Sequence, residues 1–258
     1  SHNTVLVDGQ EQNRRVARDT HTVWEPKAPR WMTNAEWDFA EGSYEDGYGV
    51  EGKKIATHTR QVLFAKPDYW VVLDTMTPAD AEGHTYEALF HLDAEEAVID
   101  PATRSATVEY GGAAFRIVPL CPEAVEVQVI KGQTTPVVQG WLPTGEHNKL
   151  RPIPTVAYRW KAKGRSTVGF VMIPKDAGAD WSVKQTKGET LGDGGLRATM
   201  VLADGSRDLL LRRPGGKAVQ AEGPLDTDAT LAVVRLGAKG ETLRTFQSDG
   251  TRLEVRPQ

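Results

Sequence analysis

The chain has 258 residues, of which 39% are hydrophobic and 26% are charged. This balance excludes a membrane-embedded chain and a disordered one, and no apolar run approaches the ~18 residues that a membrane span needs. The formal net charge of −4 argues against a general nucleic-acid binder, which would carry an excess of Lys and Arg. We therefore expect no nucleic-acid partner and no membrane partner.

The single cysteine, Cys121, cannot form a disulfide within the chain. It lies in the apolar stretch FRIVPLCPEAVEV, so we predict a buried structural thiol. The chain opens directly on the strand-like pattern SHNTVLVDG, without an initiator Met or a signal peptide. We expect a fragment or a processed product of a longer protein.

The apolar residues recur mainly with a period of two, which is typical of β-strands. The segments ADGS, AKGE and SDGT have the composition of hairpin turns, because Gly adopts positive φ at low cost. Strands are predicted over residues 4–8, 57–64, 69–75, 85–92, 114–120, 125–131, 156–162, 167–173, 197–202, 208–212, 230–236 and 243–247.

No segment carries an apolar stripe with a period of 3.6 over three turns, so we predict an all-β fold. The expected architecture is a large antiparallel β-sandwich with a smaller C-terminal β region. The composition changes at PKDAGAD, residues 174–180. Residues 1–174 would form the main sandwich, and residues 175–258 would form either a small accessory sheet or the far end of the same sandwich.

Residues 11–49 differ from the rest and are interpreted as a long excursion with short strands at an edge of the sandwich. Aromatic rings stack on sugars, and arginines bind carboxylate or sulfate groups in a bidentate manner. The segment therefore has the composition of an acidic-polysaccharide surface, with Arg14, Arg15, Trp31 and Trp37 as its candidate binding residues. The alternative is that the rings pack beneath a long loop and the arginines are solvated. The aromatic residues are Trp24, Trp31, Trp37, Tyr44 and Tyr48, and the arginines are Arg14, Arg15, Arg18 and Arg30.

Few residues match a general catalytic pattern. The six histidines form no HxH, HExxH or CxxC-type metal signature, and GxSxG and GxxxxGK[ST] do not occur. His58 and Arg60 would share one face of a strand, and we interpret His58 as a hydrogen-bonded structural histidine. Glu41, Glu45 and Asp46 could supply the carboxylates of a glycosidase, but solvated loop acids are the simpler interpretation.

Several motifs resemble the heparinase II/III-like polysaccharide lyases over roughly residues 1–174. The opening SHNTVLVDGQEQ resembles an "HNT…VDG" strand of their C-terminal β-sandwich, which is of the supersandwich type. The segments EGSYEDGY, THTRQVLFAKPDYWVVLD and HTYEALFHLD resemble the strands that follow, and VQGWLPTGEHNKLRPIPTVAYRW resembles a "GW…PxPxxxY" segment. Residues 175–258 match no part of the family pattern.

The resemblance implies a secreted or periplasmic bacterial enzyme that cleaves a uronic-acid-containing polysaccharide by β-elimination. In this family a helical toroid precedes the sandwich and carries most catalytic groups, so the catalytic residues are expected upstream of residue 1. The histidine of the HNT motif binds a structural Zn²⁺ together with upstream residues in several members. This motif maps to His2, which in a continuing strand would point away from the core face of Val5 and Val7.

Two other functions remain open. The chain could be a non-catalytic carbohydrate-binding or scaffolding β-sandwich, or an accessory domain of a glycoside hydrolase. The sequence leaves undetermined which polysaccharide is cleaved, whether cleavage is endo or exo, and the oligomeric state.

Overall fold

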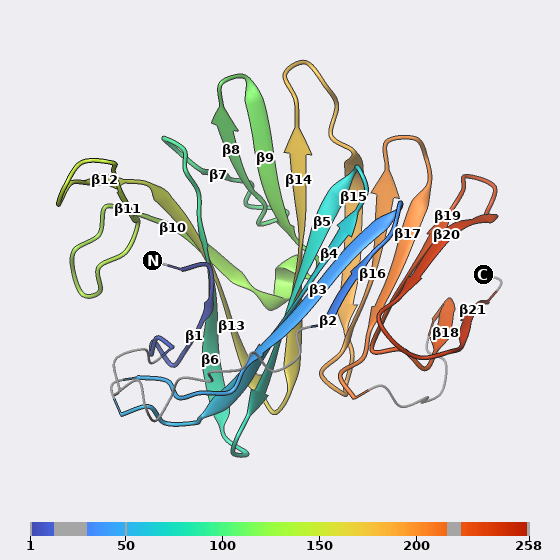
Figure 1. Cartoon of the computed structure of the whole chain (residues 1–258), viewed down its shortest axis with the longest axis horizontal. Helices are drawn as coiled ribbons and strands as arrows, with labels where there is room; N and C mark the ends of the chain where they lie inside the picture. Colours follow the sequence, from blue (N-terminus) through green and yellow to red (C-terminus); the bar gives the residue numbers. More distant parts are fainter. Residues whose placement is uncertain (1, 13–29, 50, 216–222, 257–258) are drawn as a thin grey trace.

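The fold is almost entirely built from β-strands, as the computed structural model of the chain shows (Figure 1). The structure describes residues 2–12, 30–49, 51–215 and 223–256. Within these ranges there is no α-helix, and the one helical turn is the 3₁₀ segment η1 (Pro122–Ala124). No helix in the described part of the chain has the length and apolarity that crossing a bilayer would require. The predicted all-β class is confirmed.

The largest element is an eight-stranded antiparallel sheet. It contains, in spatial order, β2 (Arg30–Thr33), β3 (Trp37–Tyr44), β4 (Ala56–Ala65), β5 (Tyr69–Pro78), β14 (Ser166–Lys175), β9 (Ala113–Pro119), β8 (Ala106–Tyr110) and β7 (Val98–Ile99). The edge strand β2 and its neighbour β3 come from the segment predicted to be a long excursion. Strand β3 is longer than that prediction suggested, because Trp37 and Phe39 alternate inward while Asp38 and Ala40 face the other side.

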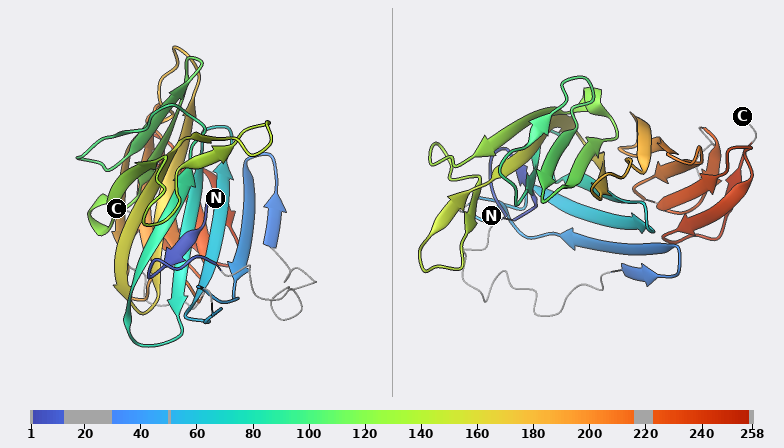
Figure 2. Two further views of the ribbon diagram at one scale, coloured as in Figure 1. Left: turned by 90° about the vertical axis from the view of Figure 1, so that its left-hand side faces the viewer. Right: turned by 90° about the horizontal axis from the view of Figure 1, so that it is seen from above.

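Two smaller antiparallel sheets lie on opposite sides of the eight-stranded sheet (Figures 1 and 2). The four-stranded sheet has the order β1 (Val5–Val7), β6 (Gly83–His91), β13 (Pro154–Lys163) and β10 (Glu126–Lys131). The five-stranded sheet has the order β15 (Val183–Thr190), β16 (Leu196–Leu202), β17 (Arg207–Arg212), β19 (Leu231–Leu236) and β20 (Thr242–Gln247). Two short pairs complete the fold, namely β11 (Trp141–Pro143) with β12 (Leu150–Pro152), and β18 (Leu225–Thr227) with β21 (Leu253–Val255).

The alternation of side chains along each central strand produces two hydrophobic cores. Leu73 on β5 and Val171 on β14 belong to the core shared with the five-stranded sheet. Met76 and Phe170 on the same two strands belong to the core shared with the four-stranded sheet. The eight-stranded sheet is therefore apolar on both faces, which explains why its central strands read as nearly continuous apolar runs.

The five-stranded sheet is also fastened by a buried polar network. The Tyr69 hydroxyl on β5 donates a hydrogen bond to Asp208 on β17, and Arg235 on β19 binds Asp208 at 2.6 Å and Asp68 at 2.6 Å. Burial raises the pKa of the Tyr69 hydroxyl well above its ordinary value, and the charge of Asp208 adds to this effect. The tyrosine therefore remains a hydrogen-bond donor.

The remaining local predictions are mostly confirmed. All twelve predicted segments contain a strand. Gly205 and Gly240 have positive φ in the hairpin turns that precede β17 and β20. SDGT also forms a turn, but the two strands around it pair with different partners and make no hairpin. Cys121 is a buried free thiol, and burial raises its pKa to about 12.

Candidate functional site

A charged cluster lies on the eight-stranded sheet where this sheet faces the four-stranded sheet. Asp74 on β5 is fully buried, and strand pairing places Arg60 of β4 directly opposite it. Arg60 Nε and Nη2 donate to the two carboxylate oxygens at 2.7 and 2.8 Å, and His58 Nε2 donates to Oδ1 at 2.7 Å. The prediction that His58 and Arg60 share a face, with His58 in a structural hydrogen bond, is confirmed.

The Asp74 carboxylate remains ionised despite its burial. Burial alone would raise the pKa of Asp74, but attraction to Arg60 and the hydrogen bond from His58 outweigh this effect and hold the pKa well below its usual range. Burial would likewise lower the pKa of Arg60, whereas the charge of Asp74 keeps it raised. The two charges neutralise each other, so this pair is suited to holding the sheet and its neighbours in position.

Asn3 connects this cluster to the four-stranded sheet. Its backbone carbonyl accepts a hydrogen bond from Arg60 Nη1 at 2.5 Å. Its side-chain Oδ1 accepts hydrogen bonds from the backbone N and from Nδ1 of His91 on β6, at 2.8 and 3.0 Å. The amide of Gln139 lies 2.9 Å from the other ring nitrogen of His91. These contacts assign the His91 proton to Nδ1, and the segment that precedes β1 is thereby tied to both sheets.

His91 is favoured in its neutral form at this position. Burial lowers the pKa of His91. His2 is exposed and precedes β1, where the amide of Thr4 donates to its backbone carbonyl at 3.0 Å. The expectation that His2 continues the strand is wrong, because the chain bends before Val5. Val5 and Val7 are fully buried, as predicted.

The described residues offer little of a zinc site around His2. No group of three or more His, Cys, Asp or Glu side chains within the described ranges is arranged to hold a metal ion. A structural zinc usually takes four protein ligands. His2 could supply one of them, and the others would have to come from outside the described residues.

The predicted carbohydrate-binding residues divide into three groups. Trp31 on edge strand β2 is 68% exposed. Trp37 on β3 is 1% exposed and packs in the core against Phe246, with the Arg244 guanidinium 4.7 Å from the centre of its ring. In this structure Trp37 is therefore inaccessible to a sugar, which agrees with the core-packing alternative. Arg14 and Arg15 lie outside the described residues.

The environment of Glu41 also differs from the one predicted, which was that of a solvated loop acid. It lies within β3, where Arg30 of β2 pairs with it at 2.6 Å and the buried amide of Gln61 donates to it at 2.5 Å. Arg30 also contacts Asp249 at 3.0 Å. Glu41 thus belongs to a polar contact between β2, β3 and the end of the five-stranded sheet.

The strand register places Trp31 on the same sheet face as the charged cluster. Trp31 pairs with Ala40, and Ala40 pairs with Val62, which alternates on β4 with Arg60. Trp31 and Arg60 are therefore two strands and two residues apart, or roughly 12 Å. An exposed indole beside a charged cluster is an arrangement that can bind a sugar ring by stacking.

Comparison with protein families identifies this architecture. The model described as "Heparinase II/III-like, C-terminal" matches residues 1–170, which is more than half of the chain. The chain belongs to the heparinase II/III-like family. The predicted resemblance to this family is thereby confirmed, and the family match ends within β14.

Solved structures of heparinases share this fold. A heparan sulfate lyase from Pedobacter heparinus superposes with a TM-score of 0.58 at 16% identity, over 81% of this chain and 30% of that one. A heparinase III structure has a TM-score of 0.57 at 14% identity, over 83% of this chain and 30% of the other. Another heparinase III matches over 99% of this chain and 29% of its own length, with a TM-score of 0.55 and 11% identity. No curated protein sequence matches the chain.

The heparinase II/III-like chain thus spans about 30% of the length of these neighbours. Sequence reasoning had identified His2, His58 and Arg60, whereas it missed Asp74, Asn3 and His91 as members of the cluster. The available signal was the single acid in the apolar run YWVVLDTM, which needs a buried partner to be stable. Identifying that partner required the strand register.

Proposed function

We propose that this chain is the β-sandwich part of a polysaccharide lyase that cleaves a uronic-acid-containing polysaccharide by β-elimination. The observation that carries the proposal is the family match over residues 1–170. The chain's coverage of about 30% of a heparan sulfate lyase supports a further catalytic part, which we place in a helical domain upstream of residue 1. The catalytic residues of this chain remain unassigned.

The sandwich would contribute to the reaction by binding and positioning the polymer. In β-elimination a base removes the proton beside the uronate carboxylate, and an acid protonates the departing oxygen at the neighbouring carbon. Exposed Trp31 would stack on a sugar ring near the cluster of Arg60, Asp74 and His58. Arg14 and Arg15 would bind the acidic groups of the same polymer. Trp37 is left out of this role because it is buried.

A structural zinc is proposed at His2, with its remaining ligands supplied from outside the described residues. The metal would crosslink the segment before β1 to the upstream part of the enzyme and add to its folding stability. We also propose that the protein acts outside the cytoplasm of a bacterium, either secreted or in the periplasm, because an enzyme would encounter a polymeric polysaccharide substrate there.

A non-catalytic carbohydrate-binding or accessory sandwich is the alternative function. It is favoured by one observation, that the charged cluster is internally neutralised and buried. The lyase and the alternative function can be distinguished by incubating uronate polymers with a protein that joins this chain to its proposed upstream domain. A lyase forms an unsaturated product that absorbs ultraviolet light, whereas a glycoside hydrolase releases saturated sugars and a binding module releases none.

A further inference from the structure

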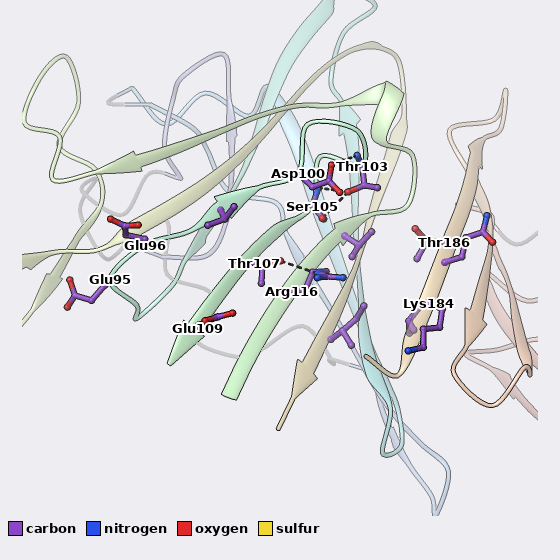
Figure 3. Close-up of a pocket in the computed structure, with 15 residues that line it drawn as sticks. Glu95, Glu96, Asp100, Thr103, Ser105, Thr107, Glu109, Arg116, Lys184 and Thr186 are labelled. Atoms are coloured by element: carbon purple, nitrogen blue, oxygen red, sulfur yellow. Dashed lines mark hydrogen bonds between the residues drawn. The ribbon is translucent and has the colours of Figure 1, made fainter. Parts of the chain in front are cut away.

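A second surface, remote in the fold from the charged cluster, forms an open cleft of about 900 Å³ (Figure 3). The five-stranded sheet covers only part of one face of the eight-stranded sheet. Strand β15 is the edge of the five-stranded sheet and marks the limit of the covered area. Strands β7, β8 and β9 continue beyond β15, so their face remains open. The cleft lies between this open face and β15.

The floor and the two sides of the cleft differ in character. Val118 and Ile173 contribute to an apolar floor. Figure 3 shows Lys184 and Thr186 on β15 at one side, Glu95 and Glu96 at the other, and Arg116 between them. Asp100 and Glu109 line the cleft as well, so its carboxylates outnumber its two cationic groups, Arg116 and Lys184.

Arg116 on β9 is held rigidly within this cleft. Its Nε donates to Thr107 Oγ1 at 3.1 Å, and its guanidinium carbon lies 4.0 Å from the centre of the Trp181 ring. Trp181 is itself packed against the core, and Lys175 Nζ lies 5.1 Å from the same ring. Because both contacts fix the guanidinium plane, little side-chain entropy remains to be lost on binding a ligand.

Arg116 also lacks the carboxylate partner that most other arginines of this protein have. Within the described residues no acid forms an ion pair with it, and burial lowers its pKa while the charge of Asp100 only partly opposes that effect. The Asp100 carboxylate is occupied by the backbone amides of Ala102 and Thr103 at 2.8 and 3.4 Å. A half-buried guanidinium with free N–H donors, facing an open cleft, is a binding group for an anion.

We propose that this cleft binds an acidic sugar unit through a bidentate contact between Arg116 and a carboxylate or sulfate group. Lys184, whose ammonium group lies 3.4 Å from the exposed Asp180 carboxylate, would exchange this surface pair for the ligand and add a second positive charge. The hydroxyl of Thr186 would bond to a sugar hydroxyl. The acids Glu95 and Glu96 would accept hydrogen bonds from hydroxyl groups at the far end of the same unit, and they would repel a second anionic group. The cleft is therefore matched to one anion in a hydroxyl-rich ligand.

The geometry of the cleft alone points to a ligand with an anionic group. That this ligand is a saccharide rests on the proposed function. The site would be a second binding point for the polymer, remote from the face that carries Trp31 and Arg60. This second site would hold the polysaccharide without taking part in bond cleavage.

Isothermal titration of the full chain with short oligosaccharides tests this proposal. Three probes are used, namely a uronate oligosaccharide, a sulfated heparin fragment and a neutral malto-oligosaccharide. We expect Arg116→Gln to weaken binding of the acidic probe roughly tenfold or more, because charge-assisted hydrogen bonds are lost. Arg116→Lys should give an intermediate loss, since the charge remains but the planar contact does not. Comparing the first two probes shows whether carboxylate or sulfate is preferred.

Arg252→Gln is the matched control, because Arg252 is an exposed arginine that pairs with Asp226 on a distant part of the fold. This variant should bind as the parent chain does. Melting temperatures of all variants show whether the fold is retained. Probe affinities are then compared among the variants that are folded. The proposal is overturned if Arg116→Gln binds the acidic probes with unchanged affinity, or if the neutral probe binds equally well. An acidic probe whose binding instead depends on Trp31 would refute the second site while leaving the proposed function intact.

Discussion

Arg60 holds the buried carboxylate of Asp74 by two hydrogen bonds of 2.7 and 2.8 Å, from a strand that pairs with it directly. Because the carboxylate has no contact with solvent, removing its charge leaves the guanidinium without compensation. We predict that Asp74→Asn lowers the free energy of unfolding by about 3 to 5 kcal/mol. Chemical denaturation measures this change. Glu189→Gln, which breaks the exposed pair with Arg197, should cost at most about 1 kcal/mol. Equal losses in the two variants would contradict the structural role of Asp74.

The sequence predicted most of the fold because its central strands carry a clear signal. Trp70, Val72 and Leu73 belong to an apolar run that only a strand buried on both faces explains. Strand β15 was missed, since its sequence VKQTKGET has an exposed, polar pattern without apolar alternation. Residues 11–49 were expected to form a long excursion with short strands, whereas β3 is a regular strand of eight residues in which Trp37 and Phe39 point into the core.

The candidate site was less predictable than the fold. His58 and Arg60 could be placed on one face from their spacing alone, and this placement is confirmed. Their partner Asp74 lies on a different strand, so its identity depends on the register of a pair that residue spacing does not determine. Trp31 and Trp37 are six positions apart in similar surroundings, yet one is exposed and the other is buried. That difference depends on the five-stranded sheet, which supplies Phe246.

His84 is expected to make stability depend on pH in the neutral to alkaline range. Its Nδ1 lies 2.7 Å from Asp8 and its Nε2 3.0 Å from Asp80. The hydrogen bond with Asp8 raises the pKa of His84, burial opposes this effect, and Asp80 adds to it. Because the folded pKa is raised, the stabilisation is complete below the ordinary value of 6.5 and is lost as pH rises through the folded pKa.

The corresponding experiment is thermal or chemical unfolding between about pH 6 and pH 9. We predict that His84→Gln loses part of the decline in stability that the parent chain shows over this window. His147→Gln, which changes an exposed histidine, should keep the parent's dependence. An NMR titration of His84 that gives a pKa at or below the ordinary value would contradict this prediction.

The two tryptophans should separate binding from stability. We predict that Trp31→Ala weakens binding of uronate polymers and leaves the melting temperature nearly unchanged, since the side chain is 68% exposed. Trp37→Ala should lower the free energy of unfolding by about 3 to 5 kcal/mol, because it empties a core position. Polymer affinity and thermal unfolding are measured on both variants. Normal polymer binding by a folded Trp31→Ala protein would remove Trp31 from the proposed site.

Zinc binding at His2 is expected only in the proposed longer enzyme, because His2 is the only ligand that this chain is proposed to supply. In that enzyme we predict that His2→Ala lowers the zinc content and the melting temperature together, since the metal would contribute to folding. Elemental analysis of purified protein measures the first change. His147→Ala provides a control at an exposed histidine. A His2→Ala enzyme with the parent's zinc stoichiometry would show that His2 is no ligand.

The central claim is that this sandwich works together with a separate catalytic part. It is tested most directly by measuring the ultraviolet absorbance of unsaturated product in two reactions on a uronate polymer, one with this chain alone and one with the preceding helical domain added as a second chain or fused to it. We expect product only when both parts are present. Product from this chain alone would place the catalytic groups within it. Polymer binding without product from the combined protein would contradict the lyase assignment.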